Sequence, residues 1–186
     1  GRHGLALLLP DPGVGGVVAP SRRALPPHLK LQDERVDYDA LPDDAPWWAV
    51  DAVVCTLGTT IRVAGSREAF QRLHHIYRLQ VGALAGRHGA RGYALNSALG
   101  ADPGSRVFYS RVKGELERDL ALLGFPSLTF VRPGLIGGDR DEHRTGEQVA
   151  TVVLGALRPL LPRAWRISPA SRIAAALVEA ALQARP

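Results

Sequence analysis

Short apolar segments alternate with helix-forming segments along this chain, and this alternation constrains the fold more than any other feature. The clearest segment, 52–57, is continuous, rich in β-branched residues and ended by Gly58, as in a strand buried on both faces. Further strands are expected at 14–19, 35–38, 92–96 and 127–131, and helices at 5–9, 66–87, 109–122, 146–157 and 171–184. Strands that alternate with helices predict an α/β fold with a parallel sheet.

Candidate site residues follow the predicted strands. Five residues that could contact a ligand lie at or just past the end of a predicted strand: Arg22, Asp37, Gly58, Ser97 and Pro133. In parallel sheets of this kind, ligands bind beyond the carboxyl ends of the strands. We therefore expect these residues to lie along one ligand-binding edge.

Tyr109 and Lys113 place a phenol and an amine four residues apart, with their Cβ atoms about 5–6 Å apart on one helix face. Apolar residues continue the helical pattern, and no proline occurs before Pro126. Only two of the 23 basic residues are lysines, so a lysine at this position is unusual for the chain. With Ser97 twelve residues upstream, the pattern predicts one proton-handling site; an ordinary surface helix is the alternative.

The long helix at 66–87 begins at Ser66, the expected N-cap, although the capping box is imperfect. Apolar residues at spacings of three and four mark its buried face: Phe70, Leu73, Tyr77, Val81 and Leu84. Adjacent helical residues point about 100° apart, so His74 and His75 do not form a metal site. We expect the two histidines on a solvated face.

Composition limits the class of protein. A chain of 186 residues with 46% hydrophobic residues most often forms one domain with its own core. The net charge is +5, and apart from the pair Arg22-Arg23 the arginines are spread singly along the chain, which argues against nucleic-acid binding. No apolar stretch is long enough for a membrane span. The single cysteine, Cys55, lies in a predicted strand and indicates packing and a reducing compartment, so a cytoplasmic protein is expected.

In its order of elements the chain resembles the short-chain dehydrogenase/reductases, in their extended or atypical branch. A strand, Ser97, the Tyr-x-x-x-Lys pair, another strand and Arg132-Pro133-Gly134 follow one another. Three stretches, 55–60, 109–115 and 139–147, are more narrowly similar to small oxidoreductases of the Tat-interacting-protein type. The resemblance covers 50–186 well and 1–49 loosely. It implies one Rossmann-like domain over 1–186, a doubly wound parallel sheet with helices on both faces and a small substrate-side portion at about 134–170.

The N-terminal region departs from that family. The resemblance implies a first strand and a Gly-x-x-Gly-x-x-Gly loop whose backbone amides bind the cofactor pyrophosphate. Gly1 fits as the third glycine of that loop. The absent strand would lie in the centre of the sheet and leave two inner edges unpaired. We therefore expect the natural protein to begin ~10–15 residues earlier, on typical strand and loop lengths.

The resemblance also implies catalytic roles. Tyr109 would protonate a carbonyl oxygen as hydride arrives, or act as the base in reverse. A free tyrosine has a pKa near 10, and the Lys113 ammonium would favour the phenolate. Lys113 would also bond the nicotinamide ribose, and Ser97 would hold the substrate oxygen. A strand-end hydroxyl that caps the following loop is the alternative for Ser97.

The cofactor implied by the resemblance is NADP(H). Arginine after the second strand accommodates the 2′-phosphate of NADP, whereas an acid there would bond the 2′-hydroxyl of NAD. Arg22 and Arg23 occupy that place, and a solvated arginine pair is the alternative. The remaining cofactor contacts implied by the family are Asp37 at the adenine, Leu57, Gly58 and Thr59 beside the adenosine and ribose, and Pro133 and Gly134 at the nicotinamide.

Two functions from different classes fit these residues. The first is an NADP(H)-dependent oxidoreductase acting on a small carbonyl or alcohol substrate. The second is a cofactor-binding regulator or sensor of the same fold with little or no turnover. A sugar-nucleotide epimerase is disfavoured because little chain follows Arg132 for a substrate domain. We expect a small-molecule partner, no metal, no membrane or nucleic acid, and a monomer or homodimer; the 139–147 motif has no assigned role.

Overall fold

The computed structural model of the chain describes residues 1–134, 136–137 and 168–184. The strands within these residues are β1 (Val17–Ser21), β2 (Leu31–Arg35), β3 (Ala52–Cys55), β4 (Gly92–Asn96), β5 (Ser127–Val131), β6 (Ile136–Gly137) and β7 (Ser168–Pro169). The helices are α1 (Arg2–Leu8), η1 (Pro46–Trp48), α2 (Ile61–Ala64), α3 (Arg67–Gln71), η2 (Arg72–Ile76), α4 (Tyr77–Arg87), α5 (Phe108–Ala121) and α7 (Ala170–Gln183). The expected helix at 146–157 and the 139–147 motif lie outside the described residues, as does most of the expected substrate-side portion at 134–170.

The paired strands are parallel. A three-stranded sheet has the order β3-β4-β5, and β4 pairs in register with both neighbours, so that Gly92 faces Ala52 on one side and Ser127 on the other. A separate two-stranded sheet pairs β1 with β2, and β6 pairs with β7. Right-handed crossovers through helices are the usual way to connect parallel strands, and here each β3–β4–β5 connection contains helix.

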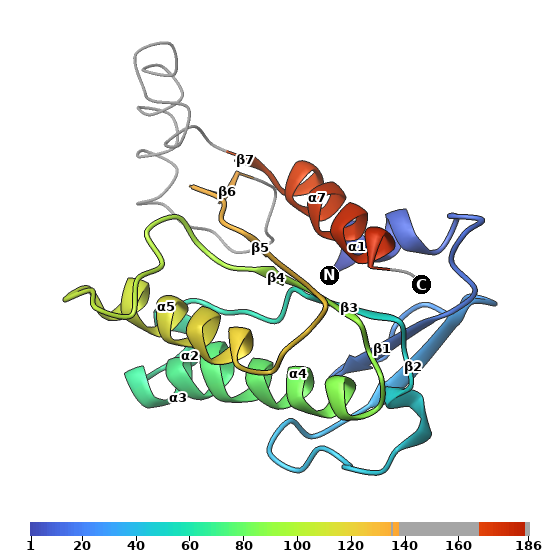
Figure 1. Cartoon of the computed structure of the whole chain (residues 1–186), viewed down its shortest axis with the longest axis horizontal. Coiled ribbons are helices and arrows are strands. Elements are labelled where there is room, and N and C mark those ends of the chain that lie inside the picture. Colours follow the sequence, from blue (N-terminus) through green and yellow to red (C-terminus); the bar gives the residue numbers. More distant parts are fainter. Residues whose placement is uncertain (135, 138–167, 185–186) are drawn as a thin grey trace.

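Helices cover both faces of the three-stranded sheet. In Figure 1, α7 and α1 lie on one side of it, and α4 and α5 lie on the other. α7 contacts all three strands and also packs against α1. The α/β Rossmann-like fold with parallel strands flanked by helices is thus confirmed.

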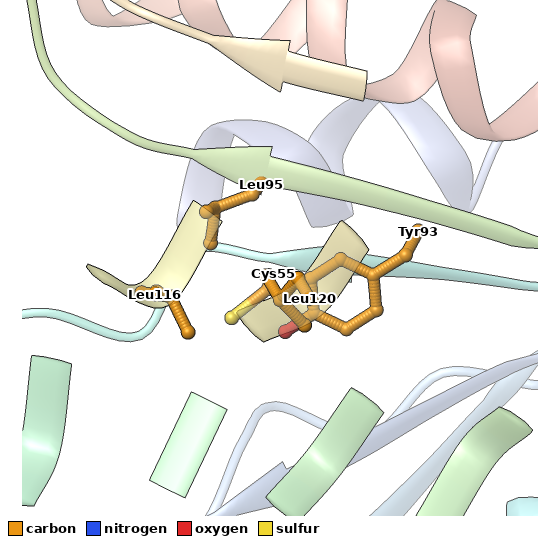
Figure 2. Packing of buried hydrophobic residues seen from close by; sticks show 5 residues of the cluster. All are labelled: Cys55, Tyr93, Leu95, Leu116 and Leu120. Atoms are coloured by element: carbon orange, nitrogen blue, oxygen red, sulfur yellow. The ribbon is translucent and has the colours of Figure 1, made fainter. Parts of the chain in front are cut away.

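The main core lies between the sheet and α5. Figure 2 shows its buried members, Cys55, Tyr93, Leu95, Leu116 and Leu120. Because α5 is amphipathic, its apolar face packs on the sheet here, and Leu95, Leu116 and Leu120 are fully buried. Cys55 is a packed core residue, as its position in an apolar strand predicts.

Strand boundaries at the N-terminal end differ from expectation. The strand expected at 35–38 is instead β2 at Leu31–Arg35, a mostly polar segment. Its pairing with β1 is supported by the Asp33 carboxylate, which accepts hydrogen bonds from the Ser21 hydroxyl at 2.7 Å and from Leu25 N–H at 2.9 Å. Backbone pairing and these side-chain hydrogen bonds place the strand at 31–35, although apolar residues alone favour the segment just after it, 35–38.

The long helix is continuous but changes type in the middle. Ser66 caps it as predicted, since its hydroxyl accepts a hydrogen bond from Ala69 N–H at 3.1 Å. The α-helix α3 leads into one π-helical segment, η2, and then into α4. A π-helical turn contains one extra residue, so it rotates the buried face of the helix that follows it.

The edges of β1 and β3 that point away from their partners carry no paired strand within the described part of the chain. The resemblance to the short-chain dehydrogenase/reductases implies a central strand at this position of the sheet.

Candidate active site

Tyr109 and Lys113 lie together on α5. The Lys113 Nζ is 5.7 Å from the centroid of the Tyr109 ring. Lys113 is only 2% exposed, whereas Tyr109 is 39% exposed. The Phe70 ring packs at 5.8 Å from the Tyr109 ring and holds the phenol against the long helix. The helix therefore presents a half-exposed phenol next to a buried amine, as the four-residue spacing predicts.

Burial dominates the electrostatics of Lys113. Loss of hydration, and then the nearby charge of Arg78, hold the pKa of Lys113 well below its ordinary value. The charges of Cys55 and Glu117 act to raise the pKa of Lys113. Glu117 is already paired with Arg132, whose Nε lies 3.0 Å from Glu117 Oε1. The ammonium of Lys113 therefore has only partial compensation from the protein.

Ser97 follows β4 directly and is 3% exposed. Its N–H donates to the carbonyl of Val131 at 2.9 Å, and Leu99 N–H donates to Pro133 O at 2.9 Å. These two bonds extend the β4–β5 pairing, so the segment after Ser97 lies beside Pro133 and Gly134. The Ser97 hydroxyl is buried and has no hydrogen-bond partner among the described residues. A buried hydroxyl without a partner can still donate a hydrogen bond to a ligand oxygen.

The loop that carries Leu57, Gly58 and Thr59 continues from β3 at the same edge. Gly1 lies close to it, since a Cβ added at Gly1 would be 3.9 Å from the Thr56 hydroxyl oxygen. Gly58 is exposed, and Thr59 is half-buried. The structure thus brings Gly1 and this loop together at the carboxyl end of β3.

A cavity of about 250 Å³ joins Arg22 to this loop. It is lined by Arg22, Thr59, Val63, Ala64, Ala69, Arg72, Leu73 and Tyr77. Two arginines, Arg22 and Arg72, and two hydroxyl-bearing residues line it together with four apolar residues. Guanidinium groups are well suited to binding an anionic group. Arg23 and Asp37 are not among its lining residues. Asp37 instead accepts a hydrogen bond from Asp39 N–H at 2.9 Å, and Arg23 O accepts one from the Ser21 hydroxyl at 2.7 Å.

Arg72 and Tyr77 also line a second cavity, of about 420 Å³, together with Tyr38, Asp39, Glu68, Gln71, Ile76 and Gln80. The Arg72 guanidinium is 2.7 Å from the Asp39 carboxylate. Tyr77 stacks on Tyr38 at 5.6 Å between ring centroids. Neither cavity is lined by Ser97, Tyr109 or Lys113.

The solvated position expected for the two histidines is wrong for His74, which is 4% exposed. His74 faces the Gly58–Thr59 loop, and His75 faces α5, where its Nε2 is 2.7 Å from Asp119 Oδ2. Arg78, also missed by sequence reasoning, is 1% exposed. A series in steps of four from Phe70 reaches both His74 and Arg78, and that spacing is the signal that could have identified them.

Similarity to known proteins identifies the family. A protein from Emericella nidulans named fmp52, mitochondrial, is 33% identical over 165 residues, which cover 84% of this chain and 71% of that protein. A protein of the same name from Aspergillus niger is 31% identical over 195 aligned positions, 99% of this chain and 83% of that protein. The chain belongs to the fmp52 family. The rat protein HTATIP2 is 38% identical over 136 residues, 73% of this chain and 54% of that protein. No protein-family model matches the chain.

The family corrects one expectation. Several of its fungal members are named mitochondrial, and this contradicts the cytoplasmic location predicted from cysteine usage and composition. A single buried cysteine indicates a reducing environment but does not identify the compartment.

Two further features are absent from the described part of the chain. None of its helices is both long and apolar enough to cross a membrane. No three His, Cys, Asp or Glu side chains in it gather as a metal-binding group.

Proposed function

We propose that the protein is an NADP(H)-dependent oxidoreductase of the short-chain dehydrogenase/reductase type, acting on a small carbonyl or alcohol substrate. The observation that carries the proposal is the Tyr109–Lys113 pair: a half-exposed phenol whose ring centroid lies 5.7 Å from a buried lysine Nζ, on the helix that follows β4. The family, the parallel sheet and the edge shared by Ser97 and the Gly58–Thr59 loop support it.

The roles of the chain's own residues follow from their chemistry. Bound NADPH would supply the hydride to the carbonyl carbon. Tyr109 donates its phenolic proton to the carbonyl oxygen. The product alcohol thus takes its new C–H hydrogen from the hydride and its O–H hydrogen from Tyr109. Lys113, in its ammonium form, stabilises the phenolate that remains, because its Nζ lies 5.7 Å from the centroid of the Tyr109 ring. The buried Ser97 hydroxyl, which lacks a partner among the described residues, donates to the same substrate oxygen.

Preference for NADP(H) over NAD(H) is part of the proposal and rests on Arg22. Arg22 lines the cavity with Thr59, whereas the adjacent Arg23 does not, so the two arginines form a matched pair. Arg22→Ala should weaken NADPH binding about tenfold and leave NADH binding within twofold. Arg23→Ala should change neither. Equal affinities of the wild-type protein for NADPH and NADH, measured by fluorescence titration, would contradict this preference.

A second candidate function is a cofactor-binding regulator or sensor with little turnover. One observation favours it: Ser97 and Lys113 are almost fully buried, and neither described cavity reaches them. Tyr109→Phe separates the two functions. An oxidoreductase loses turnover on a carbonyl panel, by roughly 10² or more, and keeps NADPH affinity. A sensor shows no turnover in either form and the same affinity.

Location and assembly complete the proposal. The mitochondrial names of fungal relatives support a mitochondrial protein, which a fluorescent fusion with a mitochondrial marker would test. The expected partners are a small-molecule substrate and, at most, a second copy of the chain, which light scattering would distinguish from a monomer.

A further inference from the structure

His74 and Arg78 form a buried polar layer directly under the Gly58–Thr59 loop. His74 is 4% exposed and Arg78 is 1% exposed, and they lie one turn apart where η2 meets α4. A Cβ added at Gly58 would lie 3.0 Å from Arg78 Nη2 and 3.4 Å from His74 Cε1. The loop backbone therefore packs closely on these two side chains, and a larger residue at position 58 would make a tight contact with them.

His74 is bonded to the loop as well as packed under it. Its Nε2 lies 3.0 Å from Thr59 N and 2.8 Å from Thr59 O. In one tautomer Nε2 accepts from the N–H, and in the other it donates to the carbonyl, so either form ties the ring to Thr59. The ring is also stacked on Phe70 at 4.0 Å between centroids. Burial, with Lys113 and Arg78 nearby, lowers the pKa of His74 to about 3, so the ring is neutral at physiological pH.

This layer is poorly satisfied by the rest of the protein. Arg78 Nη1 donates to Asn96 O at 3.2 Å, but Arg78 Nε and His74 Nδ1 are buried without a hydrogen-bond partner in the described part of the chain. A buried guanidinium with incomplete hydrogen bonding destabilises a fold relative to an apolar side chain of similar size. Packing alone would be served better by methionine at Arg78 and phenylalanine at His74.

We infer that His74 and Arg78 are positioning residues that hold the Gly58–Thr59 loop in its ligand-binding shape at the expense of folding stability. The inference rests on the proposed function in taking the ligand to be NADPH. Neither residue needs to touch the cofactor, because each acts through the loop backbone. Thr59 is the link, since it both bonds to His74 and lines the cavity with Arg22.

The adjacent histidines supply a matched pair of variants. His74→Phe keeps the ring and its stacking on Phe70 but removes the bond to Thr59. His75→Phe changes the next residue, which contacts Asp119 on the other side of the helix. Hydrogen exchange of the ligand-free protein, followed by mass spectrometry, should show the peptide containing Thr59 exchanging at least tenfold faster in His74→Phe. The same peptide should be unchanged in His75→Phe, and His74→Gln, which retains a donor and an acceptor, should recover protection.

Affinity and stability form the second readout. Arg78→Met and His74→Phe should weaken NADPH binding about tenfold or more, and Arg78→Met should unfold at the same temperature as the wild type or higher. If Arg78 had a merely structural role, its substitution would lower the NADPH affinity and the temperature of unfolding together. If His74→Phe does not fold, Gly58→Ala replaces it, because the added Cβ makes tight contacts with the same two side chains.

Two results would overturn the inference: unchanged Thr59 protection in His74→Phe, or a joint loss of stability and affinity in Arg78→Met. Failure of the proposed function looks different. In that case the wild-type protein does not bind NADPH, while the exchange difference between His74→Phe and His75→Phe still decides whether the loop is anchored by His74.

Discussion

Lys113 is a buried amine next to a second buried cation, Arg78, and its charge depends on that neighbour. Burial and Arg78 both disfavour the ammonium, so the pKa of Lys113 lies well below its ordinary value. Arg78→Met removes the like charge and should therefore raise the pKa of Lys113. The chain has only two lysines, so protein labelled with ¹³C at the lysine ε carbon gives two signals that can be followed through a pH titration.

The Lys113→Met variant assigns the Lys113 signal in that spectrum. Titration of Lys113 in the wild type near the value of a free lysine, about 10.4, would contradict its burial in this environment. An unchanged midpoint in Arg78→Met would show that Arg78 does not act on Lys113.

His74 makes folding stability depend on pH. The pKa of His74 is about 3 in the folded protein, because of burial first and then Lys113 and Arg78, and about 6.5 in an unfolded chain. Between these two values only the unfolded state binds the proton, so the free energy of unfolding decreases as pH falls below 6.5. The expected loss between pH 7 and pH 5 is about 2 kcal/mol, from about 1.4 kcal/mol per pH unit.

Urea denaturation of the wild type and of His74→Phe at both pH values measures this contribution. The variant should lack the His74 part of the loss, whereas His75→Phe should retain it. If the free energy of unfolding changes with pH in the same way in the wild type and in His74→Phe, then His74 binds a proton as readily in the folded as in the unfolded protein.

The start of the long helix depends on one side chain. The Ser66 hydroxyl satisfies Ala69 N–H, one of the donors that the first helical turn leaves open. Ser66→Ala should lower the free energy of unfolding by about 1 kcal/mol, the usual value of an N-cap, and Ser66→Asp should restore it. Thermal or urea unfolding of the three proteins tests this, and an alanine variant as stable as the wild type would show that packing of Phe70 alone fixes the helix start.

Elements whose signal is local could be predicted from the sequence. β4, β5 and the Ser66 cap were predicted to the residue, because continuous apolar segments and capping hydroxyls act over a few neighbours. β2 could not be placed, since its pairing depends on Ser21 and Leu25 contacting Asp33 across the loop. The Tyr109–Lys113 pair was predicted from helical spacing, but the cavity around Arg22 and Arg72 depends on how separate elements pack.

The π-helical segment explains why His74 and Arg78 were missed. An uninterrupted α-helix would bury Tyr77 and Val81 after Leu73. The extra residue in η2 moves the buried face by one position, so Arg78 and Gly82 are buried while Tyr77 and Val81 are only half-buried. The spacing of four from Phe70 through His74 to Arg78 follows the buried face, whereas the apolar pattern through Tyr77 and Val81 points to a different face.

At the scale of the whole molecule, the candidate ligand-binding edge is divided between two sheets. Arg22 follows β1 in the two-stranded sheet, whereas Thr59 and Ser97 follow strands of the three-stranded sheet. The cavity of about 250 Å³ is the place where Arg22 and Thr59 meet. A ligand that occupies it contacts both parts and should therefore stabilise their association.

NADPH should accordingly raise the temperature of unfolding of the whole protein. A ligand at one hundred times its Kd stabilises the folded state by about 2.7 kcal/mol, which for a chain of this size corresponds to roughly 5–10 °C. Differential scanning fluorimetry with NADPH, and with NADH at the same concentration, measures the effect, and the NADPH shift should be the larger. Arg22→Ala should reduce the NADPH shift towards that of NADH, while Arg23→Ala should preserve it, because only Arg22 lines the cavity between the two sheets. Equal reductions in the two variants would indicate a general effect of surface charge rather than a ligand held between the sheets.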